Sequence, residues 1–295
     1  MPNDNLKSYL QLHLIVFIWG FTAILGALIS LDALPLVWFR MSLAVVFIAL
    51  YVYFKKIPLR IPLRTVVGLL IAGLVIALHW LTFFMAIKVS NVSVTLACIS
   101  TGAFFTALLE PLFYKKKVVW YEVLFGVIVV IGLGIIFKVE TKYVEGIALA
   151  LTSAFLSATF SIINGTFAKT YNPSLISFYE IAGGVLFLSL FLLCTGGFSA
   201  DFFLLTASDW GWLLLLSSIC TAYAFIGSVK VMKFISPYTV MLTINLEPVY
   251  GITLAVLFFP GKEKMSFEFY IGALVILSTV IMNVIIKNYK KKAVA

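Results

Sequence analysis

Four ionisable side chains of this sequence lie inside apolar stretches that are long enough to cross a bilayer. Glu247 lies near the middle of the stretch from Tyr238 to Pro260, within the sequence Asn-Leu-Glu-Pro. Arg40, His79 and Glu180 lie in three other stretches. Because a carboxylate at the bilayer centre costs at least about 2.5–3.5 kcal/mol, we expect these side chains to face other helices or a water-filled cavity that the rest of the chain encloses.

Each of these side chains suits a binding role and also has a structural alternative. Glu247 could bind a substrate ammonium group or a proton, or it could be a protonated acid bonded to a neighbouring helix. The Arg40 guanidinium could hold a substrate carboxylate at two points, or reach the surface or a helix-end carbonyl. His79 could carry a coupled proton, because imidazole titrates near neutral pH, or donate one structural bond. Glu180 could pair with a substrate or a cation, or with a basic residue at the cytoplasmic surface.

Amide and aromatic side chains inside the apolar stretches extend this set. Asn245 precedes Glu247 by two residues and so points elsewhere on a helix; its amide could line the cavity or bond to another helix. Aromatic residues away from the predicted membrane surface could form a cavity wall that suits amphiphilic or aromatic compounds, although core packing explains each one alone. They are Trp19, Trp80, Tyr179, Tyr223 and Tyr250.

A further stretch carries small polar residues at helical spacing, which puts them on one face. They are Ser153, Ser157, Ser161 and Asn164. Small residues on one face let two helices approach closely. The same face could line the cavity, and the two interpretations overlap.

The elements that position these residues are membrane helices. The chain of 295 residues is 63% hydrophobic and only 11% charged, with a mean hydropathy of +1.13, which indicates a membrane protein. Helices satisfy their own backbone polar groups in lipid. Ten apolar segments of spanning length are predicted, at about residues 9–30, 34–54, 65–87, 92–114, 118–138, 143–166, 174–194, 209–230, 237–259 and 267–287.

The distribution of Lys and Arg predicts the orientation. With the N-terminus inside, 15 of the 21 basic residues fall in cytoplasmic segments and 5 in outer segments. An excess of basic residues on the cytoplasmic side is the usual pattern. We therefore expect a multi-pass protein of the cytoplasmic (inner) membrane with both termini in the cytoplasm. The net charge of +9 is explained without nucleic acid.

The sequence also repeats itself weakly. Trp19 precedes Pro35 by 16 residues, Ser157 precedes Pro173 by 16, and each proline opens a predicted span. Two halves, residues 1–140 and 141–295, would each contain five spans. Because five is odd, the halves must insert with opposite orientation, a common transporter design with its substrate site near the middle of the membrane.

Several motifs resemble those of the EamA-type drug/metabolite transporters, over essentially the whole chain. They are WGFTA (19–23), the span opened by Pro35 with Arg40 following, AIKVSNVSVTLA (86–97), LEPVYG (246–251) and Gly-Lys-Glu (261–263). The resemblance implies a carrier of small metabolites, often an exporter of amino acids or related compounds. It also implies that spans 1–4 and 6–9 surround a central cavity, with spans 5 and 10 at the periphery.

The two halves match this family unequally. Pro248 corresponds to the usual proline of the ninth span, where it frees a carbonyl about one turn earlier, and Glu263 to the usual acidic residue after it. In the first half Ala103 replaces the proline, and Lys116 or Lys117 replaces the acid. We therefore expect a chemically asymmetric cavity, in which the mid-membrane acid comes from the second half alone.

The sequence thus predicts an all-α membrane protein with ten transmembrane helices in two inverted five-helix repeats. We predict a secondary transporter, an exporter of small organic metabolites such as amino acids or amphiphilic compounds, with alternating access around a mid-membrane cavity. Proton or other ion coupling is expected, and no cofactor or metal.

Two alternatives stay open. A membrane-embedded enzyme would need a catalytic constellation, and two distant histidines without an HExxH motif argue against it. A non-transporting assembly subunit would not explain the internal polar residues, which are costly in a membrane.

Overall fold

The chain is helical throughout the part that the computed structural model describes, which is residues 2–293 except 116, 118, 140, 260, 262 and 264. The α-helices are α1 (Pro2–Leu28), α2 (Ala33–Phe54), α3 (Leu63–Val89), α4 (Val92–Ile99), α5 (Gly102–Tyr114), α6 (Trp120–Val139), α7 (Val144–Phe167), α8 (Pro173–Cys194), α9 (Ala207–Ser217), α10 (Ala224–Val231), α11 (Pro237–Ile244), α12 (Glu247–Phe258) and α13 (Phe267–Ala293). A π-helix, η3 (Ser218–Tyr223), joins α9 to α10. Two short 3-10 helices are η1 (Thr141–Tyr143) and η2 (Asp201–Phe203).

Most of these helices are long and apolar enough to cross a membrane. Eight spans within the described residues meet this criterion; α4 with α5, α9 with η3 and α10, and α11 with α12 each count as one. The apolar parts of α6 and α13 are shorter, at Val123–Ile136 and Phe267–Thr279. The predicted all-α membrane class is therefore confirmed, whereas ten complete crossings remain a prediction.

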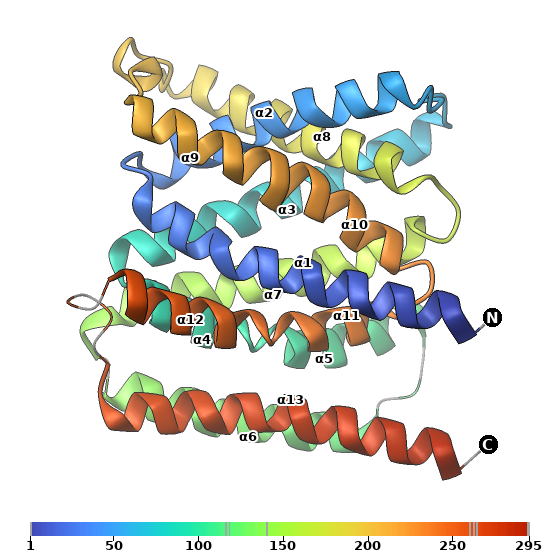
Figure 1. Cartoon of the computed structure of the whole chain (residues 1–295), viewed down its shortest axis with the longest axis vertical. Coiled ribbons are helices and arrows are strands. Elements are labelled where there is room, and N and C mark those ends of the chain that lie inside the picture. Colours follow the sequence, from blue (N-terminus) through green and yellow to red (C-terminus); the bar gives the residue numbers. More distant parts are fainter. Residues whose placement is uncertain are drawn as a thin grey trace.

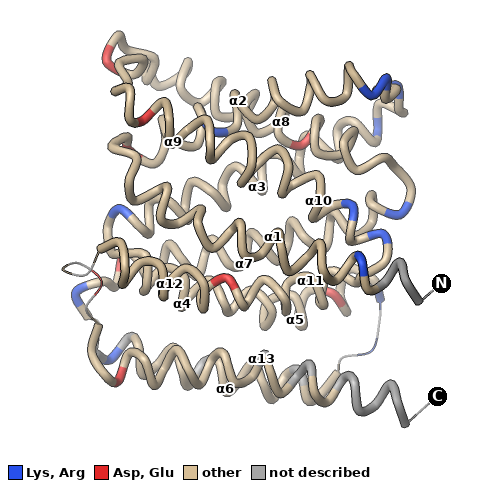
Figure 2. Tube along the Cα trace, viewed as in Figure 1, with Lys and Arg blue, Asp and Glu red and all other residues tan. Residues whose placement is uncertain are grey.

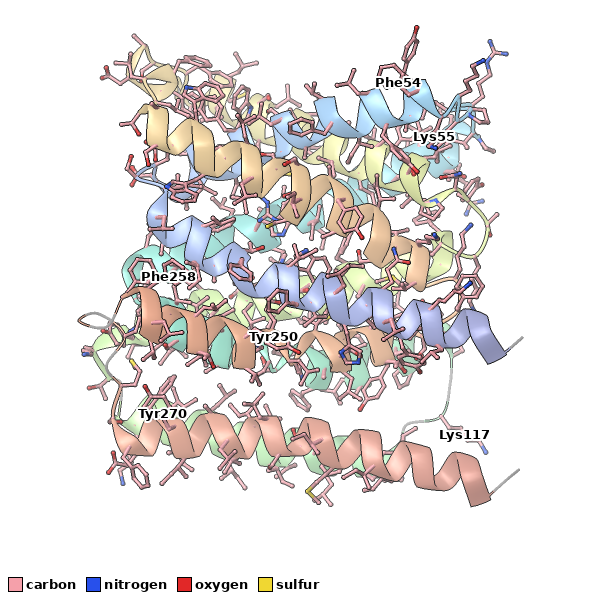
Figure 3. All side chains as sticks on the ribbon, viewed as in Figure 1. Phe54, Lys55, Lys117, Tyr250, Phe258 and Tyr270 are labelled. Carbon is pink, nitrogen blue, oxygen red and sulfur yellow. The ribbon has the colours of Figure 1, made fainter. Side chains whose placement is uncertain are left out.

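The helices lie side by side with roughly parallel axes, and the chain runs back and forth along them (Figure 1). Both termini lie at one end of the helices, which we call the terminal face; the other end is the opposite face. Phe54 and Lys55 mark the terminal face at the end of α2, and Phe258 marks the opposite face at the end of α12 (Figure 3). Lys and Arg gather mainly at the terminal face (Figure 2).

Glycines bring helices from distant parts of the chain into close contact. A Cβ on Gly73 of α3 would collide with the backbone carbonyl of Glu180 on α8. A Cβ on Gly20 of α1 would lie 2.9 Å from the Tyr250 Cβ on α12. Both contacts would be closer than ordinary side-chain contacts, so glycine at these positions lets the helices approach closely. α3 also packs on α7, and α1 on α10.

Helices α6 and α13 form a separate pair at the edge of the molecule (Figure 1). They meet at Gly132 and Gly272, where a Cβ on either glycine would lie 3.0 or 2.9 Å from the backbone oxygen of the other. This is the peripheral place that the family resemblance implies for the fifth and tenth spans.

Replacing Gly272 by alanine is expected to destabilise the α6–α13 pair. The new methyl group would lie 2.9 Å from the Gly132 oxygen and 2.8 Å from Ile136 Cγ1, and overpacking of this kind costs about 1–3 kcal/mol. Thermal unfolding of the purified protein measures the effect. The control is Gly134→Ala on α6, because no described atom lies within 4 Å of its Cβ position. An equal loss of stability in both variants would contradict this account.

Three spans of the described chain are interrupted. Ser100–Thr101 separates α4 from α5, and Asn245–Leu246 separates α11 from α12. At both places a backbone N–H bonds to the carbonyl three residues earlier instead of four. The third interruption is the π-helix η3. The predicted boundaries lie close to the observed helix ends, and each interrupted span still counts as one crossing.

The interruptions have different causes. Pro248 has no N–H, so the Ile244 carbonyl lacks its usual α-helical donor, and this effect is expected from the sequence. The α4–α5 interruption has no proline nearby. There the hydroxyls of Ser100 and Thr101 donate to backbone carbonyls three residues earlier, and such bonds compete with the helical pattern.

Candidate functional site

A central cavity lies among α1, α2, α3, α7 and the span formed by α11 and α12, with α10 as a further wall. It offers about 80 Å³ to the centres of water-sized molecules. Its polar lining consists of Thr22, Arg40, His79, Ser157, Ser161, Ser228 and Glu247, and its aromatic lining of Trp19, Trp80, Phe83, Phe160 and Phe225. The walls therefore come from both halves of the sequence.

Five of the predicted binding residues meet at this cavity. They are Trp19, Arg40, His79, Trp80 and Glu247. They come from α1, α2, α3 and α12, which are far apart in the sequence. The structure therefore brings together residues that had only their place inside apolar stretches in common.

Arg40 enters the cavity from α2 and is 1% exposed. Its Nε donates to Thr221 Oγ1 at 2.7 Å, and its guanidinium carbon lies 3.9 Å from the centre of the Trp80 ring. Nη1 has no hydrogen-bond partner among the described residues. The guanidinium is thus held at one nitrogen and across one face, while Nη1 remains available to an acceptor in the cavity.

The π-helix η3 positions both Arg40 and Trp19. Thr221 Oγ1, which accepts from Arg40, donates to the Leu216 carbonyl five residues earlier at 2.7 Å. The Cys220 carbonyl accepts the indole N–H of Trp19 at 3.1 Å. A π-helix often occurs at a functional site because it alters the backbone hydrogen bonding of a helix. Here it provides the two acceptors that orient these side chains.

His79 is oriented by one residue of α7. Its Nδ1 lies 2.9 Å from the Ser153 carbonyl oxygen and 2.8 Å from Ser153 Oγ, which in turn donates to the His79 carbonyl. Because a carbonyl oxygen only accepts, Nδ1 carries the proton of the neutral ring. Nε2 is then an acceptor, and no hydrogen bond within the described structure occupies it. His79 can therefore accept a proton or an N–H from a bound molecule.

Glu247 is the first residue of α12, where the helix N-terminus favours a negative charge. It lines the cavity and is 7% exposed. Arg40 is close enough to interact with it electrostatically, but among the described residues neither an ion pair nor a hydrogen bond engages the carboxyl. The cavity therefore holds a guanidinium and a carboxyl group that are not bonded to each other.

The rest of the cavity wall was predicted only in part. Ser157 and Ser161 line the cavity, which is one of the two interpretations of their helical face, whereas Thr22 and Phe225 were not predicted. Thr22 follows Trp19 by three residues, a spacing that places both on one face. Phe225 packs between Trp80 and Phe160, with ring centroids 5.8 and 5.5 Å apart. With 27 phenylalanines in the chain, residue type could not single it out.

Two predicted polar residues lie outside the central cavity. Asn245 points away from Glu247 and lines a separate cavity of about 20 Å³ beside α5, α6 and α13. Glu180 is fully buried in α8 and does not line the central cavity. Among the described side chains, no group of three His, Cys, Asp or Glu residues could hold a metal ion.

The three predicted tyrosines also lie outside the cavity. Tyr179 donates its hydroxyl to the Leu59 carbonyl near the terminal face at 2.9 Å. Tyr223 is 49% exposed on the outer surface of the bundle. Tyr250 lies on α12 (Figure 3) and packs against Phe17 of α1. The aromatic wall is instead formed by tryptophan and phenylalanine.

Near the opposite face, two carboxylates bond to distant parts of the chain. Glu263 is 4% exposed and accepts the amides of Val92 and Ser93, at the N-terminus of α4, at 2.9 and 3.0 Å. Asp209 on α9 accepts the amide and the hydroxyl of Ser30, both at 2.7 Å. Amides at a helix N-terminus are strong partners for an anion. Each carboxylate thus ties the second half of the sequence to the first.

Replacing Glu263 by glutamine is expected to weaken its contact with the start of α4. Glutamine has one accepting oxygen and no charge, so the α4 amides lose a charge-assisted bond, a loss of about 1–3 kcal/mol. The thermal midpoint of purified Glu263→Gln should therefore fall. Glu268→Gln is the control, because Glu268 is exposed at the start of α13. If the two variants unfold at the same temperature, the Glu263 contacts do not stabilise the protein.

The fold and the site together define a multi-pass helical membrane protein with a polar cavity enclosed by its spans. The chain matches the EamA-like transporter family over residues 6–138 and 144–285. It belongs to this family, which confirms the resemblance seen in its motifs. The family points to a membrane transporter rather than an enzyme.

Two individual proteins resemble the chain over nearly its whole length. An uncharacterized transporter of Archaeoglobus fulgidus is 24% identical over 285 residues, which cover 94% of this chain and 96% of the relative. A protein of known crystal structure superposes with a TM-score of 0.70 over 95% of this chain and 97% of its own, at 15% identity. The second similarity shows that the two chains share a fold.

Proposed function

We propose that the protein is a secondary transporter of small organic metabolites, namely amino acids or similar amphiphilic compounds. The observation that carries this proposal is the presence of a guanidinium and a carboxyl group, not bonded to each other, in one cavity. Nη1 of Arg40 suits a carboxylate, and Glu247 suits an ammonium group. The rings of Trp80, Phe160 and Phe225 suit an apolar side chain between the two charges. A zwitterion carries all three features.

We propose that the carrier works by alternating access between two inverted halves, residues 1–140 and 141–295. The family matches each half separately. Helix contacts are also repeated between the halves. α1 packs on α12, and the corresponding helix α7 packs on α4 and α5. α3 packs on α8, and the corresponding span of α9, η3 and α10 packs on α2. A rocking motion of such halves about a central site is a common transport mechanism.

We further propose that the terminal face is cytoplasmic and that transport is outward. The gathering of Lys and Arg at this face supports the orientation (Figure 2). A second cavity of about 320 Å³ lies there, lined by Tyr114, Lys169 and Met232 among others. Met232 also lines the central cavity. A substrate from the cytoplasm would pass Met232 and leave when the Glu263 and Asp209 contacts open.

Flux through purified protein in liposomes tests this function. We expect at least one radiolabelled amino acid from a broad panel to move faster than in protein-free liposomes, with a rate that depends on a pH gradient. Organic cations belong in the panel, because Glu247 could bind them without Arg40. If no member of the panel moves in either direction, the transporter proposal loses its support, and a non-transporting assembly subunit becomes the better explanation.

A further inference from the structure

A second group of polar side chains is buried on α7 and α8, which both pack against α3, apart from the residues that hold the substrate in the proposed function. Glu180 and Asn164 are both 0% exposed, and Ser161 is 3% exposed. The Asn164 amide lies at the Glu180 carboxyl, close enough to interact with it. Nevertheless, both Glu180 oxygens, both polar atoms of Asn164 and Ser161 Oγ lack a well-oriented hydrogen bond. Unsatisfied polar atoms are rarely concentrated in one place inside a protein.

The surroundings of Glu180 provide no opposite charge. Helices α2, α3 and α10 pack against α8, and no charged side chain of the described residues acts on Glu180 from any of them or from α7. On the α3 side the neighbour is Gly73, which contacts the backbone of Glu180. A buried carboxylate without a partner is strongly unfavourable. The observed arrangement therefore suits a neutral carboxylic acid.

A carboxylic acid and a primary amide are complementary when the acid holds its proton. The acid O–H donates to Asn164 Oδ1, and Asn164 Nδ2–H donates to the other Glu180 oxygen. One small rotation of each side chain then satisfies the polar atoms on both. An ionised Glu180 can only accept, so it would leave Asn164 Oδ1 without a donor. The Glu180–Asn164 pair therefore forms both of its hydrogen bonds only when Glu180 is protonated.

Ser161 connects this pair to the substrate cavity. It lies three residues before Asn164, on the same face of α7, and it lines the central cavity. Its unbonded hydroxyl can donate and accept at once. Water that enters between Ser161 and Asn164 would give the carboxyl a route to the cavity.

We propose that Glu180 and Asn164 form the binding site of a proton that the carrier exchanges for its substrate, an inference that rests on the proposed transport function. When Asn164 and Glu180 move apart, the Glu180 O–H bond breaks, the proton passes to water as hydronium, and a carboxylate remains. The reverse step takes a proton from hydronium on the other side of the membrane. Glu180 thus carries the proton, while Arg40 and Glu247 hold the substrate.

Infrared spectroscopy of the purified protein at neutral pH tests the proton site without any substrate. The wild-type spectrum should contain the C=O band of a buried protonated acid, with a shift on deuteration, and Glu180→Gln should lack this band. Glutamine can form the same two bonds with Asn164, so this variant is expected to fold. Glu145→Gln, which changes an exposed carboxylate at the start of α7, should keep the band. Identical acid bands in the wild type and Glu180→Gln would overturn the proposal.

Transport in liposomes tests the coupling. With a mixture of radiolabelled amino acids, Glu180→Gln should exchange internal for external substrate at a near wild-type rate in the absence of a gradient. The amount of substrate that this variant accumulates under a pH gradient should fall to the amount measured without a gradient. Accumulation equal to the wild type would overturn the coupling role. If the wild type moves none of the mixture, the transport function fails, whereas the infrared band still decides whether Glu180 holds a proton.

Discussion

Arg40→Lys is expected to lower the initial rate of amino-acid uptake at low substrate concentration by about ten- to a hundredfold, the effect of losing a charge-assisted hydrogen bond. Lysine keeps the charge but lacks the planar fork that joins Thr221, the Trp80 ring and a substrate carboxylate. The measurement compares an amino acid with the amine that lacks its carboxylate. The wild type should favour the amino acid strongly, and the variant should favour it weakly.

Arg60→Lys is the matched control, because Arg60 is exposed near the terminal face. Thermal unfolding of both variants shows whether Arg40→Lys still folds. If folded Arg40→Lys prefers the amino acid over its amine as strongly as the wild type does, Arg40 does not bind the carboxylate.

Glu247→Gln is expected to reduce uptake of amino acids by at least about tenfold, since an ionic hydrogen bond contributes about 1.5–3 kcal/mol. Glutamine keeps the shape of the side chain at the start of α12 but removes its charge. The loss should be small for a hydroxy acid that has no ammonium group, and the pH dependence of uptake should change. Initial rates over a range of pH measure both effects.

Glu145→Gln provides the comparison for Glu247→Gln, because Glu145 also lies in the first turn of a helix but is exposed. The double variant Arg40→Gln/Glu247→Gln is a second comparison. Arg40 and Glu247 interact electrostatically, so the double variant should be more stable than the sum of the single effects predicts. Wild-type transport by Glu247→Gln, with unchanged pH dependence, would exclude a role of Glu247 in binding or coupling.

The membrane fold could be predicted because its signals are local. Each span is a continuous apolar stretch, and Pro173, which opens a span in the sequence, is the first residue of α8 in the structure. Several family motifs lie in these same stretches. The sequence also indicated that Glu247 needed a polar environment, because its cost in lipid does not depend on the fold.

The composition of the central cavity was harder to predict, because these helices are apolar on almost every side. Tyr223 and Thr221 are two residues apart in η3, yet the first is exposed on the surface and the second is buried against Arg40. No amphipathic pattern distinguishes them, since lipid and protein interior are equally apolar. The π-helix and the α4–α5 interruption likewise depend on tertiary contacts and on hydroxyl bonds that have no unique sequence signal.

The π-helix η3 also has an evolutionary consequence. A π-turn contains one residue more than an α-turn, so deletion of a single codon within Ser218–Tyr223 would restore a regular helix and rotate α10 by about 100° relative to α9. Phe225, Ser228 and Met232 would then leave the cavity together. Under the proposed transport function, related chains that differ by one residue in this segment should therefore transport chemically different compounds, even where Arg40 and Glu247 are the same.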